Sequence, residues 1–359
     1  MKYTPLIEQH RALGAKLVDF SGWEMPIQYS GVLDEYHAVR SHTGLFDVSH
    51  MGRLEVAGTG SCAFLQRLTT NDVARLEVGQ AHYSMICNEH GGIKDDIFVY
   101  RTGDSAYLLC VNASNREKIH DWMTEHWTSS DNCRVEDRTR VLAQIAIQGP
   151  LSRDLLVAIG ADKVTELKMH RACEIKLANI PCFVARTGYS GELGFEVNVP
   201  AEHAQTLWQQ LLMKGEGKGC KPAGLGARDL LRLEMGYLLY GNDIGEDTTP
   251  LEANADWTVS FQKGDFIGRQ ALLAQQRAGV TRRFVAFELL EKAVPRHGCR
   301  ILDAVSSQPV GEVTSGNLSP ILQKGIGLGY VPAACETSGT TIATSRRRTG
   351  TFRTCEEAA

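Results

Sequence analysis

Short apolar runs, separated by Gly, Pro, Asn and Asp, recur along the chain and predict a mixture of helices and strands. From Arg282 onward only short β-type runs remain. This change predicts an all-β end domain, a small barrel or sandwich, after a region of mixed structure. Helices are predicted at residues 5–13, 33–40, 61–68, 115–126, 151–159, 202–213, 227–240 and 270–277, and end-domain strands at 284–289, 299–302, 310–314, 327–331 and 340–343.

A β-hairpin is predicted where Tyr83–Cys87 and Ile93–Arg101 flank a Gly-Gly turn. Asp95 and Asp96 lie inside its second strand, where aspartate is disfavoured. Because successive strand residues point to opposite faces, Asp96 shares a face with Phe98 and Asp95 lies on the other face. A carboxylate beside apolar surface is costly without a partner, so the acid pair is a candidate site. The alternative is a solvated acid at the end of the strand.

The composition narrows the class of protein. The 359 residues are 43% hydrophobic and 22% charged, as in ordinary globular proteins of two or three domains. A net charge of -4 argues against a dedicated nucleic-acid binder. The ten Cys form no C-x-x-C pair, and the His residues form no metal-binding motif. Scattered thiols, the lack of a membrane-spanning apolar run and a polar N-terminus predict a cytoplasmic protein.

Two further segments place single titratable residues next to apolar ones. His50 follows Asp47-Val48-Ser49 and could act as a base or ligand, or serve as a hydrogen-bonded structural group. Glu196 lies in a predicted strand between Phe195 and Val197. It could accept hydrogen bonds from N–H donors of a ligand, or lie on the solvated face of the strand.

A third segment, Ala223–Glu234, begins with Gly-Leu-Gly-Ala-Arg and leads into a predicted helix. It lacks the third glycine and the preceding strand of a dinucleotide-binding loop, which excludes that interpretation. Arg228 at the helix start could clamp an anion or stack on a planar ring, with Arg232 one turn on. The alternative is a surface pair between Asp229 and Arg232.

Taken together, ten segments closely resemble the T-protein of the glycine cleavage system, a tetrahydrofolate-dependent aminomethyltransferase. They follow the order of that family over nearly the whole chain, so the set is far more specific than any single motif. The matching segments are Thr4–Leu6, Val18–Pro26, Phe46–Met51, Thr70–Val73, Gly91–Asp96, Gln148–Pro150, Thr187–Glu192, Ala223–Asp229, Leu239–Asp243 and Thr314–Pro320.

The resemblance implies a three-domain, cloverleaf-like α+β fold with antiparallel sheets and folate in a central hole. Residues 1–278 would form two interleaved α+β domains, and residues 279–359 a small C-terminal β-barrel. Asp96 would lie near N10 of the folate, as the catalytic carboxylate, and Glu196 and Arg228 would bind the pterin ring. The other residues implied for the pocket are Met51, Tyr83, Asn112, Tyr189 and Trp257, with Arg232 and Arg296 as weaker candidates.

The implied donor is an aminomethyl group on the lipoyl arm of the H-protein. The products would be 5,10-methylenetetrahydrofolate, ammonia and the dihydrolipoyl H-protein. One alternative is a folate-dependent demethylase that uses an O- or S-methyl donor. Another is a non-catalytic folate-binding protein of iron–sulfur assembly, but those relatives carry a K-G-C-Y-x-G-Q-E segment, and Tyr240–Asp247 here lacks its Cys.

The C-terminus departs from the family pattern. The usual basic strand and Pro-Phe-Tyr segment do not follow Ala343; the chain instead reads Thr344–Ala359. This predicts an end barrel without its closing strand, with an open edge prone to association. Residues beyond about Arg348 are predicted to be loosely docked.

Overall fold

The computed structural model describes residues 1–337, 339–344 and 348–353. The chain divides into two compact units that alternate along the sequence. Unit 1 comprises residues 1–68, 72–84 and 96–229, and unit 2 comprises residues 69–71, 85–95 and those from 230 onward. The predicted boundary after residue 278 stays a prediction. No described helix is long and apolar enough to cross a membrane.

All eight predicted helices are present. The largest difference is at the end of α7, which stops at Glu234 and not at residue 240. Gly236 adopts a left-handed φ of 67°, and Tyr237 N donates back to Arg232 O, which together form a Schellman-type stop. The helices are α1 (Ile7–Ala12), α2 (Val32–Ser41), α3 (Ser61–Leu68), α4 (Arg116–Glu125), α5 (Ser152–Ala158), α6 (Ala204–Gly215), α7 (Leu225–Glu234) and α8 (Arg269–Ala278).

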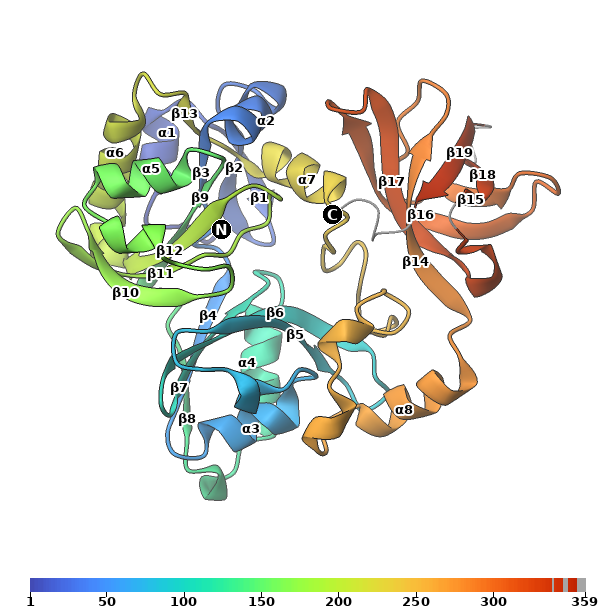
Figure 1. Cartoon of the computed structure of the whole chain (residues 1–359), viewed down its shortest axis with the longest axis horizontal. Coiled ribbons are helices and arrows are strands. Elements are labelled where there is room, and N and C mark those ends of the chain that lie inside the picture. The colour runs from blue at the N-terminus through green and yellow to red at the C-terminus, as the bar shows by residue number, and fades with distance from the viewer. Residues whose placement is uncertain (338, 345–347, 354–359) are drawn as a thin grey trace. The chain divides into compact units, whose positions relative to one another are not determined.

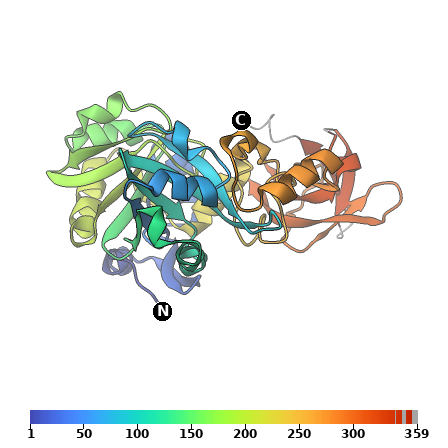
Figure 2. The same ribbon diagram turned by 90° about the horizontal axis from the view of Figure 1, so that it is seen from below.

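Unit 1 contains a six-stranded sheet that is antiparallel except at one edge. In order across the sheet, its strands are β10 (Ala172–Leu177), β11 (Ile180–Ala185), β12 (Gly194–Pro200), β9 (Leu142–Gln148), β3 (Thr43–Asp47) and β13 (Cys220–Pro222). Helices α5 and α6 lie beside this sheet (Figures 1 and 2), and Leu156 and Trp208 join its apolar face in one core. A separate two-stranded sheet pairs β1 (Lys16–Phe20) with β2 (Trp23–Gln28).

A five-stranded sheet contains the predicted hairpin. In order, its strands are β5 (Ala81–Cys87), β6 (Ile93–Gly103), β7 (Ala106–Val111), β4 (Gly52–Ala57) and β8 (Arg134–Asp137). The predicted alternation in β6 is confirmed, because Asp95 and Ile97 are buried whereas Asp96 and Phe98 are half-buried. The chain passes from unit 2 to unit 1 between Asp95 and Asp96. The two acids therefore lie in different environments: the carboxylate of Asp95 is fully enclosed, and that of Asp96 is half-buried.

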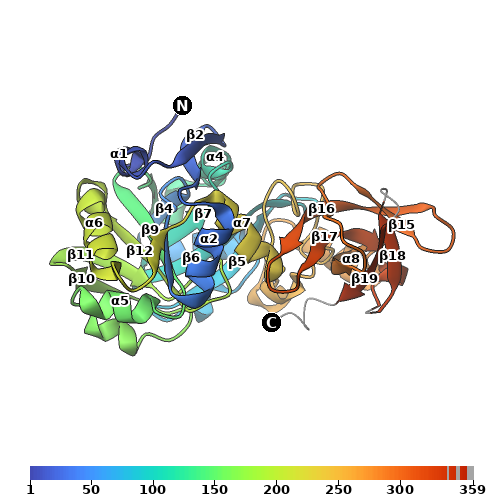
Figure 3. The same cartoon turned by 90° about the horizontal axis from the view of Figure 1, so that it is seen from above.

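Unit 2 contains the predicted end barrel. Its strands, in order around the barrel, are β14 (Arg282–Leu289), β17 (Lys324–Pro332), β16 (Pro309–Ser319), β15 (Arg300–Asp303), β18 (Thr341–Thr344) and β19 (Arg348–Arg353) (Figures 1 and 3). Inside it, Phe287, Ile301, Val313 and Ile342 share one apolar core.

The prediction that the barrel has an open edge is wrong. Strand β19 pairs with β18 on one side and with β14 on the other, so the barrel is closed. No strand was predicted here because the residues after Arg348 show no alternation of apolar and polar side chains. Thr349, Thr351 and Phe352 are nevertheless residue types of high β propensity. Backbone pairing to two neighbours closes the barrel without the expected pattern. The predicted behaviour of residues 354–359 lies outside the described residues.

Candidate active site

Asp96 is oriented by hydrogen bonds to both of its carboxylate oxygens. The Tyr83 hydroxyl donates to Oδ2 at 2.8 Å, and the Asn112 side-chain amide donates to Oδ1 at 2.8 Å. The same amide also reaches the backbone carbonyl of Asp96 at 3.1 Å. Hydrogen bonds to an ionised carboxylate favour the charged form and define its orientation. Asp96 is half-buried, so this oriented charge stays accessible.

Strand register explains why these residues meet. Phe98 of β6 pairs with Cys110 of β7, and Val111 of β7 pairs with Gly52 of β4. Continuing the β6–β7 register by two residues and the β7–β4 register by one places Asp96, Asn112 and Met51 in one row across the end of the sheet. Residues in such a row lie about 5 Å apart, within reach of one another's side chains.

A row of aromatic rings extends from Asp96 along the same face of β6. The ring centroids of Tyr83 and Phe98 are 5.8 Å apart, and those of Phe98 and Tyr100 are 5.9 Å apart. His170 and Phe183 contact the row edge-on, at 5.6 Å from Phe98 and 5.9 Å from Tyr100. The rings are tilted against one another, and Tyr100 is buried, so the row forms an aromatic wall beside Asp96 of which Phe98 stays partly exposed.

Glu196 lies at the far end of this row. It is 9% exposed, so the predicted alternative of a solvated strand face is wrong. Its Oε2 accepts hydrogen bonds from Thr187 Oγ1 at 2.7 Å and from the Tyr100 hydroxyl at 3.3 Å. Within the described residues, Oε1 accepts none. Burial and the charge of Glu196 raise the pKa of Tyr100 well above its usual value, so Tyr100 remains a neutral donor.

The turn that carries Tyr189 is shaped by Gln148 at the end of β9. Ser190 Oγ donates to Gln148 Oε1 at 2.7 Å, and Gln148 Nε2 donates to the Thr187 carbonyl at 3.3 Å. A Cβ at Gly188 would lie 2.1 Å from the Gln148 amide. A side chain at residue 188 would therefore displace the Gln148 amide from its hydrogen bonds, which favours glycine there.

Arg228 lies in the first turn of α7, with its guanidinium carbon 4.7 Å from the centre of the Tyr189 ring. This cation–π contact holds two flat groups together near the surface. The glycines before Arg228 allow close packing, since a Cβ at Gly224 would lie 2.5 Å from the Ile27 backbone. Arg228 therefore stacks on a ring of the protein itself, and its predicted contact with a ligand stays a prediction.

His50 is buried and lies edge-on to Phe20 at 5.5 Å. Burial lowers its pKa to about 3, against the opposing charge of Asp47, so the imidazole is neutral at pH 7. Its Nδ1 has no hydrogen-bond partner among the described residues. No group of three or more potential metal ligands occurs in the part of the chain that the structure describes.

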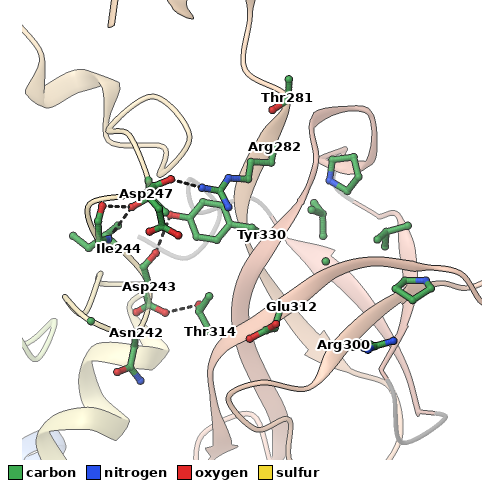
Figure 4. Close-up of a pocket in the computed structure, with 18 residues that line it drawn as sticks. Asn242, Asp243, Ile244, Asp247, Thr281, Arg282, Arg300, Glu312, Thr314 and Tyr330 are labelled. Atoms are coloured by element: carbon green, nitrogen blue, oxygen red, sulfur yellow. Dashed lines mark hydrogen bonds between the residues drawn. The ribbon is translucent and has the colours of Figure 1, made fainter. Parts of the chain in front are cut away.

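A separate cleft of about 670 Å³ lies in unit 2, between the loop at residues 241–248 and the ends of barrel strands (Figure 4). Inside it, Thr314 and the Tyr330 hydroxyl hydrogen-bond to the side chain and carbonyl of Asp243, respectively. None of the predicted site residues lines this cleft. The oriented carboxylates therefore point to the unit 1 residues as the candidate site, and not to this cleft.

Comparison with known proteins identifies the family. The model described as the GCVT N-terminal domain matches residues 6–263, and the glycine cleavage T-protein C-terminal barrel domain matches residues 282–354. The chain belongs to the glycine cleavage T-protein family.

Relatives match along nearly the whole length of this T-protein family member. An aminomethyltransferase of Halothermothrix orenii is 46% identical over 342 residues, 95% of each chain. One of Chloroherpeton thalassium is 47% identical and covers 93% of this chain and 91% of its own. The crystal structure of glycine cleavage system aminomethyltransferase T from Bartonella henselae superposes with a TM-score of 0.91, 33% identity and coverage of 98% and 97%. The predicted family, fold and aminomethyltransferase activity are thereby confirmed.

The site residues predicted from the T-protein resemblance fall into two groups. Unit 1 contains Met51, Tyr83, Asp96, Asn112, Tyr189, Glu196 and Arg228. Trp257, in the 3-10 helix Asp256–Thr258, belongs to unit 2 and is 66% exposed, so its place in the pocket stays a prediction. Arg232 is 2% exposed and forms a buried ion pair with Asp243 at 2.7 Å. Arg296 is exposed on unit 2.

Sequence reasoning missed two residues that shape this site, Gln148 and Arg53. Arg53 is buried and donates to the carbonyls of Ser49, Met51 and Thr139, which fixes the turn that precedes β4. Burial lowers the pKa of its guanidinium to about 10. Arg53 precedes Leu54-Glu55-Val56, and alternation along the strand assigns it, with Glu55, to the solvent face.

Proposed function

We propose that this chain transfers the methylene carbon of an aminomethyl group from the lipoyl arm of the H-protein to tetrahydrofolate. The reaction releases ammonia and forms 5,10-methylenetetrahydrofolate. The observation that carries the proposal is the pair of carboxylates at the two ends of one aromatic row, Asp96 and Glu196. Such a row suits a long ligand with a flat polar head and an arylamine further along. The cytoplasm is the proposed location.

The residues at the Glu196 end fit a pterin ring. Pterin presents adjacent N–H donors, and Glu196 Oε1 accepts no hydrogen bond from the described residues. Oε1 is not among the enclosed side-chain atoms that lack a partner, so this acceptor is accessible to a ligand. The stacked Arg228 and Tyr189 add a second flat surface beside the ring system.

The residues at the Asp96 end fit the chemical step. Tetrahydrofolate supplies the N5 and N10 amines that accept the methylene carbon. N10 is an arylamine and a weak nucleophile, so a fixed carboxylate beside it stabilises the positive charge that develops during attack. Tyr83 and Asn112 hold that carboxylate in one orientation before any ligand binds. A general-base role for Asp96 is compatible with the same geometry.

The decisive experiment is a turnover assay with methylamine-loaded lipoyl H-protein and tetrahydrofolate, read out as ammonia release. We expect ammonia to appear only when both the lipoylated carrier and the folate are present. Unlipoylated H-protein is the matched control for non-enzymatic release. Absence of turnover with this donor, together with demethylation of an O- or S-methyl compound, would contradict the proposal.

A further inference from the structure

Helix α2 carries two charged side chains that reach the two segments on which Arg228 and Tyr189 lie. Glu35 contacts the start of α7, and Arg40 contacts the turn that contains Tyr189. In Figures 1 and 3, α2 lies next to the beginning of α7. Neither Glu35 nor Arg40 is among the residues that the proposed function places at the ligand.

Glu35 is completely buried and accepts hydrogen bonds from three backbone N–H groups. Its Oε2 accepts from Gly224 at 2.8 Å, and its Oε1 accepts from Tyr29 and, at 3.1 Å, from Gly31. The carbonyl of Gly224 in turn accepts from the backbone N–H of Arg228 at 3.1 Å. Two consecutive hydrogen bonds therefore link the Glu35 carboxylate to the backbone of Arg228.

The charges at the start of α7 explain why Glu35 stabilises this position of Arg228. The first turn of a helix carries a partial positive charge, so Arg228 is in an unfavourable place for a cation. The negative charge of Glu35 at the same helix end offsets that cost. A buried carboxylate with three N–H donors is also rigid, because each lost hydrogen bond would leave the charge unpaired. Glu35 thus fixes the backbone from which Arg228 extends.

Arg40 holds the other partner of the stack. Its Nη1 donates to the carbonyl of Ser190 at 2.8 Å and forms an ion pair with Glu192 at 3.0 Å. The Arg40 guanidinium also lies over the ring of Tyr36, one helical turn back on α2, at 5.3 Å. Ser190 directly follows Tyr189, so Arg40 fixes the turn next to the stacked ring.

We propose that α2 is a positioning helix, whose Glu35 and Arg40 set the distance between Arg228 and Tyr189 and thereby the affinity of the site for the pterin ring. The two residues are five positions apart on one helix, about 7.5 Å along its axis. A rigid helix is a more precise spacer between two site segments than the loops that it bridges. This inference rests on the proposed function for the identity of the ligand.

The first test is a double-mutant cycle on tetrahydrofolate binding by calorimetry, with Glu35→Gln, Arg228→Ala and both together. The glutamine NH2 group would face backbone N–H donors, so the start of α7 must shift. We expect Glu35→Gln to raise the folate Kd about tenfold in the parent protein and to have almost no effect in the Arg228→Ala background. Equal effects in both backgrounds would contradict positioning through Arg228 and indicate a general loss of stability.

Arg40→Gln is the second variant, chosen because glutamine removes the charge that pairs with Glu192 and keeps a polar side chain beside Tyr36. We expect a roughly threefold rise in folate Kd with kcat at saturating folate unchanged. Asp34→Asn is the matched control, because Asp34 is on the same helix but forms an exposed ion pair with Lys221. The control should bind folate like the parent protein.

A ligand-free measurement separates failure of this inference from failure of the proposed function. In protein with 13C-labelled tyrosine, we expect Glu35→Gln and Arg40→Gln to shift the Tyr189 ring signal by NMR, and Asp34→Asn to leave it in place. If Arg228→Ala leaves folate affinity unchanged while these shifts occur, the pterin assignment fails and the positioning role stands. Unchanged ring signals in folded Glu35→Gln and Arg40→Gln variants would overturn the positioning role.

Discussion

The two ends of the aromatic row hold a carboxylate in different ways. At the Asp96 end, Tyr83 and Asn112 each take one oxygen, and the group is half-buried. At the Glu196 end, two hydroxyl groups share one oxygen of a buried carboxylate, and the described residues leave the other oxygen without a donor. The first arrangement orients a charge, whereas the second leaves a hydrogen-bonding position for a ligand. From this difference we expect the chemical step at the Asp96 end and ligand recognition at the Glu196 end.

Asp47, also in unit 1, gives a third arrangement that completes the comparison. It is fully buried, and Thr4, His10 and the Ser49 N–H all donate to it, at 2.6, 2.8 and 2.9 Å. Both oxygens are used by the protein and none of the carboxylate is accessible. By the same reasoning, Asp47 serves stability and not the ligand.

The largest expected effect is on turnover at the Asp96 end. Asp96→Asn should lower kcat by about 10²–10³ while tetrahydrofolate still binds, because one preorganised charge is lost and the shape is kept. Steady-state kinetics and calorimetry on the same preparation measure the two quantities. Asp104→Asn, in the exposed turn between β6 and β7, is the control. An unchanged kcat would remove Asp96 from the mechanism.

The next effect is on binding at the Glu196 end. Glu196→Gln should weaken tetrahydrofolate binding by about 1–3 kcal/mol, because the amide presents donors to the N–H groups of the pterin. At saturating folate, kcat should stay within a few-fold of the parent value. A variant that loses kcat and keeps its folate affinity would reverse the assignment of the two ends.

The last effect, which leaves folate binding at pH 7 unchanged, is a pH dependence of stability that belongs to Asp47. Burial would raise its pKa, but hydrogen bonds and charge from His10, with hydrogen bonds from Ser49 and Thr4, lower it to about 2. A folded-state pKa below the unfolded value of about 4 means that the stabilisation is present above pH 4 and lost as pH falls towards 2. The loss should be roughly 2 kcal/mol in urea unfolding. In Asp47→Asn this part of the acid dependence should vanish, with tetrahydrofolate affinity at pH 7 unchanged.

Sequence patterns predicted the fold well because apolar periodicity is a local property. The eight helices and five of the barrel strands were found in this way. The different environments of Asp95 and Asp96 were also predicted from the sequence, since alternation along β6 places Asp96 on the same face as Phe98. The predicted roles of Met51, Tyr83 and Asn112 came from family resemblance, because the contacts of Tyr83 and Asn112 with Asp96 depend on strand pairing between distant segments.

The features that were not predicted depend on contacts between distant segments, and no pattern in the local sequence indicates them. Gln148 shapes the Tyr189 turn from the end of another strand, and Glu35 reaches Gly224 across 189 positions of sequence. Strand β19 is held by backbone pairing on two sides, which no side-chain pattern encodes. Each of these depends on tertiary contacts that override local preference.

The alternation of the two units along the chain has a consequence for synthesis on the ribosome. Unit 2 needs residues 69–71 and 85–95, which are made early, but most of it begins only at residue 230. Those early segments leave the ribosome long before the strands of the barrel exist, at about 5–20 residues per second. A fragment that starts at residue 230 lacks them altogether. Expressed alone, it should therefore be a poor folding unit, and complementation by an N-terminal fragment supplied in trans should improve its yield of soluble protein.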